Sequence, residues 1–86
     1  MFSPGGMDLV YMRIADDIER QIRAGRWRHG DRLPGRAELA EHYGAAQMTV
    51  RRAQEELTQR GLIRVVHGKG AYVTLPGGTP GAHEEP

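Results

Sequence analysis

Apolar residues recur every four positions in the first quarter of the chain, with charged residues between them. The stripe consists of Val10, Ile14, Ile18 and Ile22. This period is typical of an amphipathic helix with one buried face. Asp8 offers an N-cap, and Gly25 follows the last apolar turn, where a left-handed residue can close the helix. The pattern therefore predicts a first helix over about residues 9–24.

Two further helical patterns follow, and each ends at a glycine. The first covers residues 36–43 and ends at Gly44, and the second covers about residues 47–60 and ends at Gly61. Their predicted inward-facing residues are Leu39, Ala40 and Tyr43 in the first, and Val50, Ala53 and Leu57 in the second. Two helices joined by a tight, glycine-containing turn are typical of a helix-turn-helix unit, although ordinary bundles also contain such neighbours.

The apolar pattern changes after the third helix. Residues 62–67 and 71–75 are rich in β-branched residues and flank the turn Gly68-Lys69-Gly70, which predicts a β-hairpin. One very short strand is expected near Arg32 and Leu33, between Gly30 and Pro34. The fold class is therefore mainly α with a small β-hairpin: a winged helix-turn-helix of three helices and a two- or three-stranded wing.

The two ends of the chain lack this periodicity. Residues 1–7 are interpreted as a flexible lead-in and residues 8–75 as the winged helix-turn-helix domain. Residues 76–86 are rich in glycine and proline, and we interpret them as a disordered tail or the start of a linker.

Charge is distributed unevenly along the chain. The formal net charge is +1, but residues 20–36 contain six arginines against one acid, and residues 51–69 contain five basic residues against two glutamates. Such stretches are compatible with binding a polyanion. On charge alone, a solvated basic surface is the more ordinary explanation.

Several functions are disfavoured by composition. The chain has no cysteine, its single serine is Ser3 in the lead-in, and His29, His42, His67 and His83 are scattered without metal-ligand spacing. No apolar run approaches the ~20 residues that span a bilayer. We therefore expect no enzyme activity, no cofactor, no metal and no membrane partner.

Several separated motifs together resemble the N-terminal DNA-binding domain of GntR-family transcriptional regulators. The resemblance covers about residues 9–75, and its motifs include Gly30-Asp31-Arg32-Leu33-Pro34, Met48-Thr49-Val50-Arg51-Arg52-Ala53 and Gly68-Lys69-Gly70. It implies a bacterial cytoplasmic regulator, associated with the nucleoid through DNA and acting as a repressor. It also implies a dimer on an inverted-repeat operator. The larger effector-binding domain usual in the family is absent from this sequence, so no effector site is expected within it.

The resemblance also indicates which residues contact DNA. They are expected to be Arg36, Gln47, Thr49, Arg51, Arg52, His67, Gly68, Lys69 and Gly70. The chain departs from the family pattern at Ala37 and Gln47, where the family usually has arginines. Glutamine pairs with adenine where arginine pairs with guanine, so we expect Gln47 to favour adenine and Arg36 to contact phosphate.

Two other functions remain open from the sequence. The missing arginines would also suit a winged-helix protein-interaction adaptor or a DNA-binding protein of low specificity. Because little apolar surface is left beyond the core, we expect either a chain that is monomeric alone and pairs on DNA or a fragment of a longer regulator.

Overall fold

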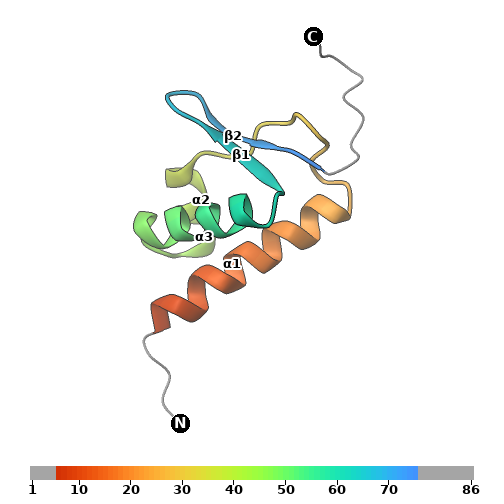
Figure 1. Ribbon diagram of the computed structural model, residues 1–86. Helices are drawn as coiled ribbons and strands as arrows, with labels where there is room; N and C mark the ends of the chain where they lie inside the picture. Colours follow the sequence, from red (N-terminus) through yellow and green to blue (C-terminus); the bar gives the residue numbers. More distant parts are fainter. Residues whose placement is uncertain (1–5, 76–86) are drawn as a thin grey trace.

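The computed structural model describes residues 6–75, and for residues 6–9 it describes the backbone only. Three helices precede a two-stranded antiparallel hairpin (Figure 1). In chain order the elements are α1 (Gly6–Arg23), α2 (Arg36–Tyr43), α3 (Gln47–Gln59), β1 (Ile63–Val66) and β2 (Gly70–Val73). The predicted winged helix-turn-helix arrangement is confirmed.

The start of α1 differs from the prediction. The helix begins at Gly6, so Asp8 lies inside its first turns and is not the N-cap. Gly6 and Met7 thus belong to the helix and not to a flexible lead-in; no proline follows Pro4 in this region to prevent the extra turn. The rest of the lead-in, residues 1–5, and the tail, residues 76–86, lie outside the described residues.

The core forms where α3 packs against α1, α2 and β1. Its largest fully buried side chains are Ile18, Ile22, Val50, Leu57, Leu62 and Val73. Val10 was expected in the same stripe but is 38% exposed, because the N-terminal turns of α1 extend past the other helices (Figure 1). Trp27 and the tyrosines at positions 11, 43 and 72 are half-buried, and the first three of these four rings pack against the core.

A tight cap joins α3 to the hairpin. Gly61 has a φ of 77°, its N–H bonds to the carbonyl of Thr58, and the N–H of Leu62 bonds to the carbonyl of Leu57. These two bonds satisfy the last carbonyls of the helix in a left-handed glycine cap. The chain therefore reverses at once, and β1 begins two residues after Gly61.

The hairpin is anchored to the segment before α2. Strands β1 and β2 pair from Ile63 with Val73 to Val66 with Gly70. Arg32 forms a single bridge with Tyr72, and the N–H of Leu33 bonds to the carbonyl of Ala71. The short strand expected near Arg32 is therefore a single-residue bridge, and it positions the hairpin beside the start of α2.

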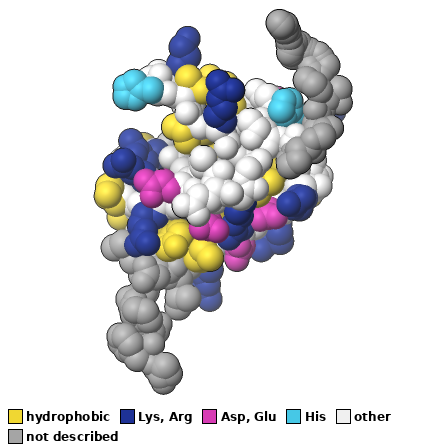
Figure 2. All heavy atoms as spheres, viewed as in Figure 1, with side chains coloured by type: hydrophobic (Ala, Val, Ile, Leu, Met, Phe, Trp, Pro, Cys, Tyr) yellow, Lys and Arg dark blue, Asp and Glu magenta, His cyan; other side chains and the backbone are white. Residues whose placement is uncertain are grey.

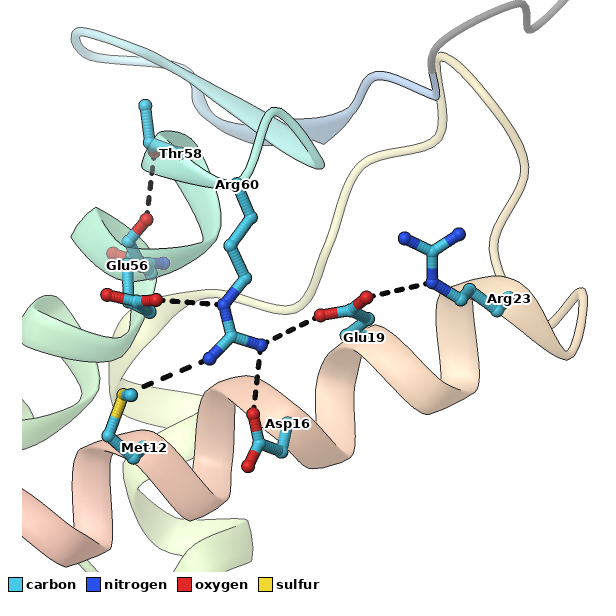
Figure 3. A network of polar contacts seen from close by, with 8 residues as sticks. Met12, Asp16, Glu19, Arg23, Glu56, Thr58 and Arg60 are labelled. Atoms are coloured by element: carbon cyan, nitrogen blue, oxygen red, sulfur yellow. Dashed lines mark hydrogen bonds and ion pairs between the residues drawn. The ribbon is translucent and has the colours of Figure 1, made fainter.

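Arg60 ties the end of α3 to α1 (Figure 3). Its Nε donates to Glu56 at 2.9 Å, and its Nη1 lies 2.9 Å from Asp16 and 2.8 Å from Glu19. Glu19 also accepts a hydrogen bond from Arg23 at 2.8 Å. These bonds from Arg23 and Arg60 lower the pKa of Glu19.

A second polar cluster links α1 to the end of α2. The hydroxyl of Tyr43 donates to Asp17 at 2.6 Å, and the amide of Gln21 donates to the same carboxylate at 2.7 Å. The Tyr43 hydrogen bond is the main cause of the lowered pKa of Asp17. Burial, together with the Asp17 carboxylate, raises the pKa of Tyr43 to about 12. The two clusters hold α2 and α3 in a defined orientation on α1.

Candidate nucleic-acid interface

An open hollow of about 650 Å³ lies between the start of α2, the outer side of α3 and the hairpin. Four basic side chains line it: Arg32, Arg36, Arg51 and Lys69, with His67 beside them. All its lining residues belong to the described part of the chain, and none is aspartate or glutamate. The hollow therefore offers a concentrated positive potential to an anionic surface.

A second depression, along α1, has a different character. It measures about 680 Å³, and its charged lining residues are Arg13, Asp16, Asp17 and Arg20. Arg20 is ion-paired with Asp17. Because the two signs of charge are balanced there, this depression attracts a polyanion less than the hollow beside the hairpin does.

Figure 2 shows basic side chains and a histidine over the hairpin, and more basic side chains with an acidic one between them on the left, where α3 begins. Arg51 is the fifth residue of α3 and lines the hollow, so the hollow adjoins the leading end of this helix. An exposed helix end flanked by a basic loop fits the dimensions of a DNA major groove and its flanking phosphates.

Arg36 and Arg51 occupy two sides of the hollow, as a shared interface requires. Arg36 is the first residue of α2 and is exposed. The side chain of Arg51 is 55% exposed, and its Nε lies 3.5 Å from a carboxylate oxygen of Glu55. Such a long and exposed pair contributes little, so the Arg51 guanidinium can exchange it for a phosphate or a base edge.

Gln47 is exposed at the first position of α3. The preceding residue, Ala46, is the N-cap and makes no side-chain hydrogen bond to the helix end. Gln47 is the first residue of α3, so its side-chain amide lies at the solvent-exposed N-terminal end of the helix.

Thr49 does not lie where the sequence placed it. It was expected off the apolar stripe, on the exposed face, but only 5% of its surface is exposed. Positions 49 and 53 are four residues apart, so Thr49 lies above Ala53 on the buried side of α3. Thr49 therefore supports the seating of α3 and has little surface to offer a ligand.

Arg52 lies away from the hollow. Its guanidinium carbon is 4.4 Å from the centre of the Tyr11 ring on α1, a cation–π contact between the two helices. Arg52 does not line the hollow, although its side chain is exposed. The structure thus brings together Arg36, Arg51 and the hairpin residues but places Arg52 on the α1 side of α3.

The hairpin loop presents His67, Gly68 and Lys69 to solvent. Gly68 has a φ of 77°, which lets the loop close in three residues between the paired Val66 and Gly70. The N–H of Lys69 bonds to the carbonyl of Val66 at 2.9 Å, so the lysine sits on an ordered turn at the rim of the hollow.

Arg32 is a candidate contact that the sequence analysis missed. Its guanidinium lies over Gly70, where a Cβ would come within 2.8 Å of Nε, and Gly70 has a φ of 125°. The absence of a side chain at position 70 thus allows Arg32 to reach the hollow. The available signal was the position of Arg32 in the short strand that pairs with the hairpin.

Two negative findings concern the described residues alone. They contain no group of three or more histidine, aspartate or glutamate residues that could hold a metal ion. None of their helices combines the length and apolar character that crossing a membrane requires.

Comparison with known proteins identifies the family of the chain. Residues 10–73 match the family model described as bacterial regulatory proteins, gntR family. The chain is 40% identical over 68 residues to a histidine utilization repressor of Klebsiella aerogenes and 41% identical over 63 residues to the transcriptional regulator TreR of Bacillus subtilis. These matches cover 79% and 73% of this chain but 28% and 26% of the relatives.

Solved structures show the same fold. The DNA-binding domain of AraR in complex with operator ORR3 is similar over 76% of this chain and 78% of that one, with a TM-score of 0.73 and 28% identity. A GntR family transcriptional regulator from Listeria monocytogenes is similar over 76% of this chain and 57% of that one, with a TM-score of 0.72 and 34% identity. The chain therefore belongs to the gntR family of bacterial regulatory proteins.

Proposed function

We propose that this chain binds double-stranded operator DNA in a sequence-selective way and contributes to transcriptional repression in the bacterial cytoplasm. The observation that carries the proposal is the exposed leading end of α3 beside a hollow lined by four basic side chains and no acid. A similar domain, that of AraR, has been solved in complex with its operator, which supports operator binding by this chain.

The proposed contacts fall into two groups. Arg32, Arg36 and Lys69 contact phosphates, because these basic side chains surround the hollow. Gln47 and Arg51 read base edges in the major groove, Gln47 at adenine and Arg51 at guanine. Gly68 and Gly70 let the loop approach the DNA backbone closely, with His67 at its edge. Thr49 contributes indirectly, by seating the helix that carries the readers.

Operator symmetry and repression are proposed from the relatives and from geometry. A histidine utilization repressor is among the relatives, which favours repression. One chain carries one α3 and one wing, so it fits one half-site; two copies on an inverted repeat, about one helical turn apart, would fill an operator. The chain spans about a quarter of the length of the curated relatives it matches.

Selection of duplexes from a random DNA library tests the proposal. Purified chain at low ionic strength is expected to enrich a short half-site that contains adenine where Gln47 reads. The variant Gln47→Arg is expected to change that adenine to guanine, since each bidentate pair discriminates by about 1–3 kcal/mol. Enrichment of no sequence, by either protein, would refute sequence-selective binding and leave the protein-adaptor function as the better explanation.

A further inference from the structure

Met48 is the most exposed large apolar side chain that the structure describes. It is 60% exposed, compared with 53% for Val65, 38% for Val10 and 37% for Met12. It is also the second residue of α3, next to Gln47 at the leading end of the helix. The helix that carries Met48 is proposed to enter DNA. We therefore expect this exposed apolar side chain to be buried there against an apolar group of the DNA.

The helical geometry of α3 places Met48 at the middle of its outward face. Successive residues are about 100° apart around a helix, so position 48 lies opposite the buried side formed by Val50, Ala53 and Leu57. Arg51 and Arg52 follow three and four residues later on the same exposed side. Met48 thus projects from the face of α3 that the two arginines flank, one turn nearer to the helix start.

The chemistry of the major groove narrows the partner of Met48 to one group. Base edges there present hydrogen-bond donors and acceptors and a single apolar group, the C5 methyl of thymine. A thioether is a weak acceptor and has no donor, so it gains little from the polar base edges. The unbranched methionine side chain has three rotatable bonds, so it can adjust its conformation to contact a nearby apolar group.

We propose that Met48 packs against a thymine methyl group and thereby selects thymine in the half-site. This inference rests on the proposed DNA-binding function and adds a specificity determinant to it. Gln47 reads a base by hydrogen bonding, and Met48 reads a neighbouring base by apolar contact. Met48 thus joins Gln47 and Arg51 as a base-reading residue, and its partner is a methyl group instead of a polar base edge.

Replacing thymine by deoxyuridine tests the proposal, because the two bases differ only by the methyl group. Each thymine of the selected duplex is replaced singly, and binding is measured by fluorescence anisotropy. Burial of one methyl group predicts that one replacement weakens binding by the native chain about fourfold. The variant Met48→Ala is expected to bind the thymine and deoxyuridine duplexes equally. The matched control Met12→Ala, on α1, is expected to retain the fourfold difference.

The outcomes separate this proposal from the function on which it rests. Selective binding that is insensitive to every deoxyuridine replacement would overturn the role of Met48 and leave DNA binding intact. Sensitivity that persists in Met48→Ala would assign the methyl contact to another residue and also overturn it. Loss of selective binding by the native chain itself would overturn both. Circular dichroism of Met48→Ala is expected to match the native chain, since the side chain lies outside the core.

Discussion

The start of α3 lacks a side-chain cap, and restoring one should stabilise the domain. Ala46 is the N-cap, with φ −70° and ψ 151°, an extended conformation that serine adopts readily. A hydroxyl at this position would accept a hydrogen bond from the backbone N–H of Met48 or Thr49. Replacing serine by alanine at N-caps typically costs about 1 kcal/mol, so Ala46→Ser should raise the free energy of unfolding by about that amount.

The variant Ala46→Gly gives the reasoning a sharper test. At an N-cap, glycine is better than alanine, whereas inside a helix it is worse by about 1 kcal/mol. Stability at position 46 should therefore follow the order Ser, Gly, Ala. Gly35 is the N-cap of α2 and also makes no side-chain bond, so Gly35→Ser is a matched control with an expected gain of only about a few tenths of a kcal/mol.

Thermal unfolding followed by far-ultraviolet circular dichroism measures these differences. For a domain of this size, 1 kcal/mol corresponds to a shift in Tm of about 4–8 °C. Urea unfolding, followed by Trp27 fluorescence, gives the free energies independently. A lower Tm for Ala46→Gly than for the native chain would refute the assignment, because it would place position 46 inside the helix.

Four other outcomes follow from the fold. Arg60→Met should lower the free energy of unfolding by about 1–2 kcal/mol in urea, with a smaller loss at high salt, because its three carboxylate partners lose their shared cation. Acid titration followed by Tm should show stability falling below the ordinary pKa values of 4.5 and 3.8, as protonation removes the interactions that lower the pKa of Glu19 and Asp17. Because the pKa of Tyr43 is raised from 10.0 to about 12, stability present below pH 10 should be lost as the pH rises through that interval, and Tyr43→Phe should remove this alkaline loss; an unchanged alkaline profile would contradict it. Gly68→Ala, at a φ of 77°, should lower the free energy of unfolding by about 1–2 kcal/mol in the same urea assay, because the alanine Cβ is strained in the left-handed region.

The elements of the fold were predictable because local signals agreed with one another. Helix α2 has the predicted bounds, and α3 ends one residue before the predicted position, since glycines at 44 and 61 mark both helix ends. Runs of β-branched residues and a glycine-containing turn located the hairpin. The start of α1 was less predictable, because Asp8 is a strong N-cap residue by type but the helix continued past it to Gly6.

The candidate site was harder to predict because exposure depends on tertiary packing. Thr49 is polar and was placed on the exposed face, but the close approach of α3 to its neighbours buries it. Arg52 has the same charge as Arg51, and only the position of Tyr11 on α1 shows why the two arginines diverge. Arg32 enters the hollow through a contact with Gly70, a residue 38 positions away, and the short strand expected near Arg32 did not indicate this partner.

The most direct test of DNA binding by the hollow face is the salt dependence of affinity for a selected duplex, measured for charge-matched variants. Lys69→Gln and Arg51→Gln each remove one positive charge from the hollow, and Arg23→Gln removes one from the end of α1, away from it. The negative slope of log affinity against log salt should become shallower by about one for each hollow variant and should not change for Arg23→Gln. Equal slopes for all three variants would contradict the assignment of this face to DNA.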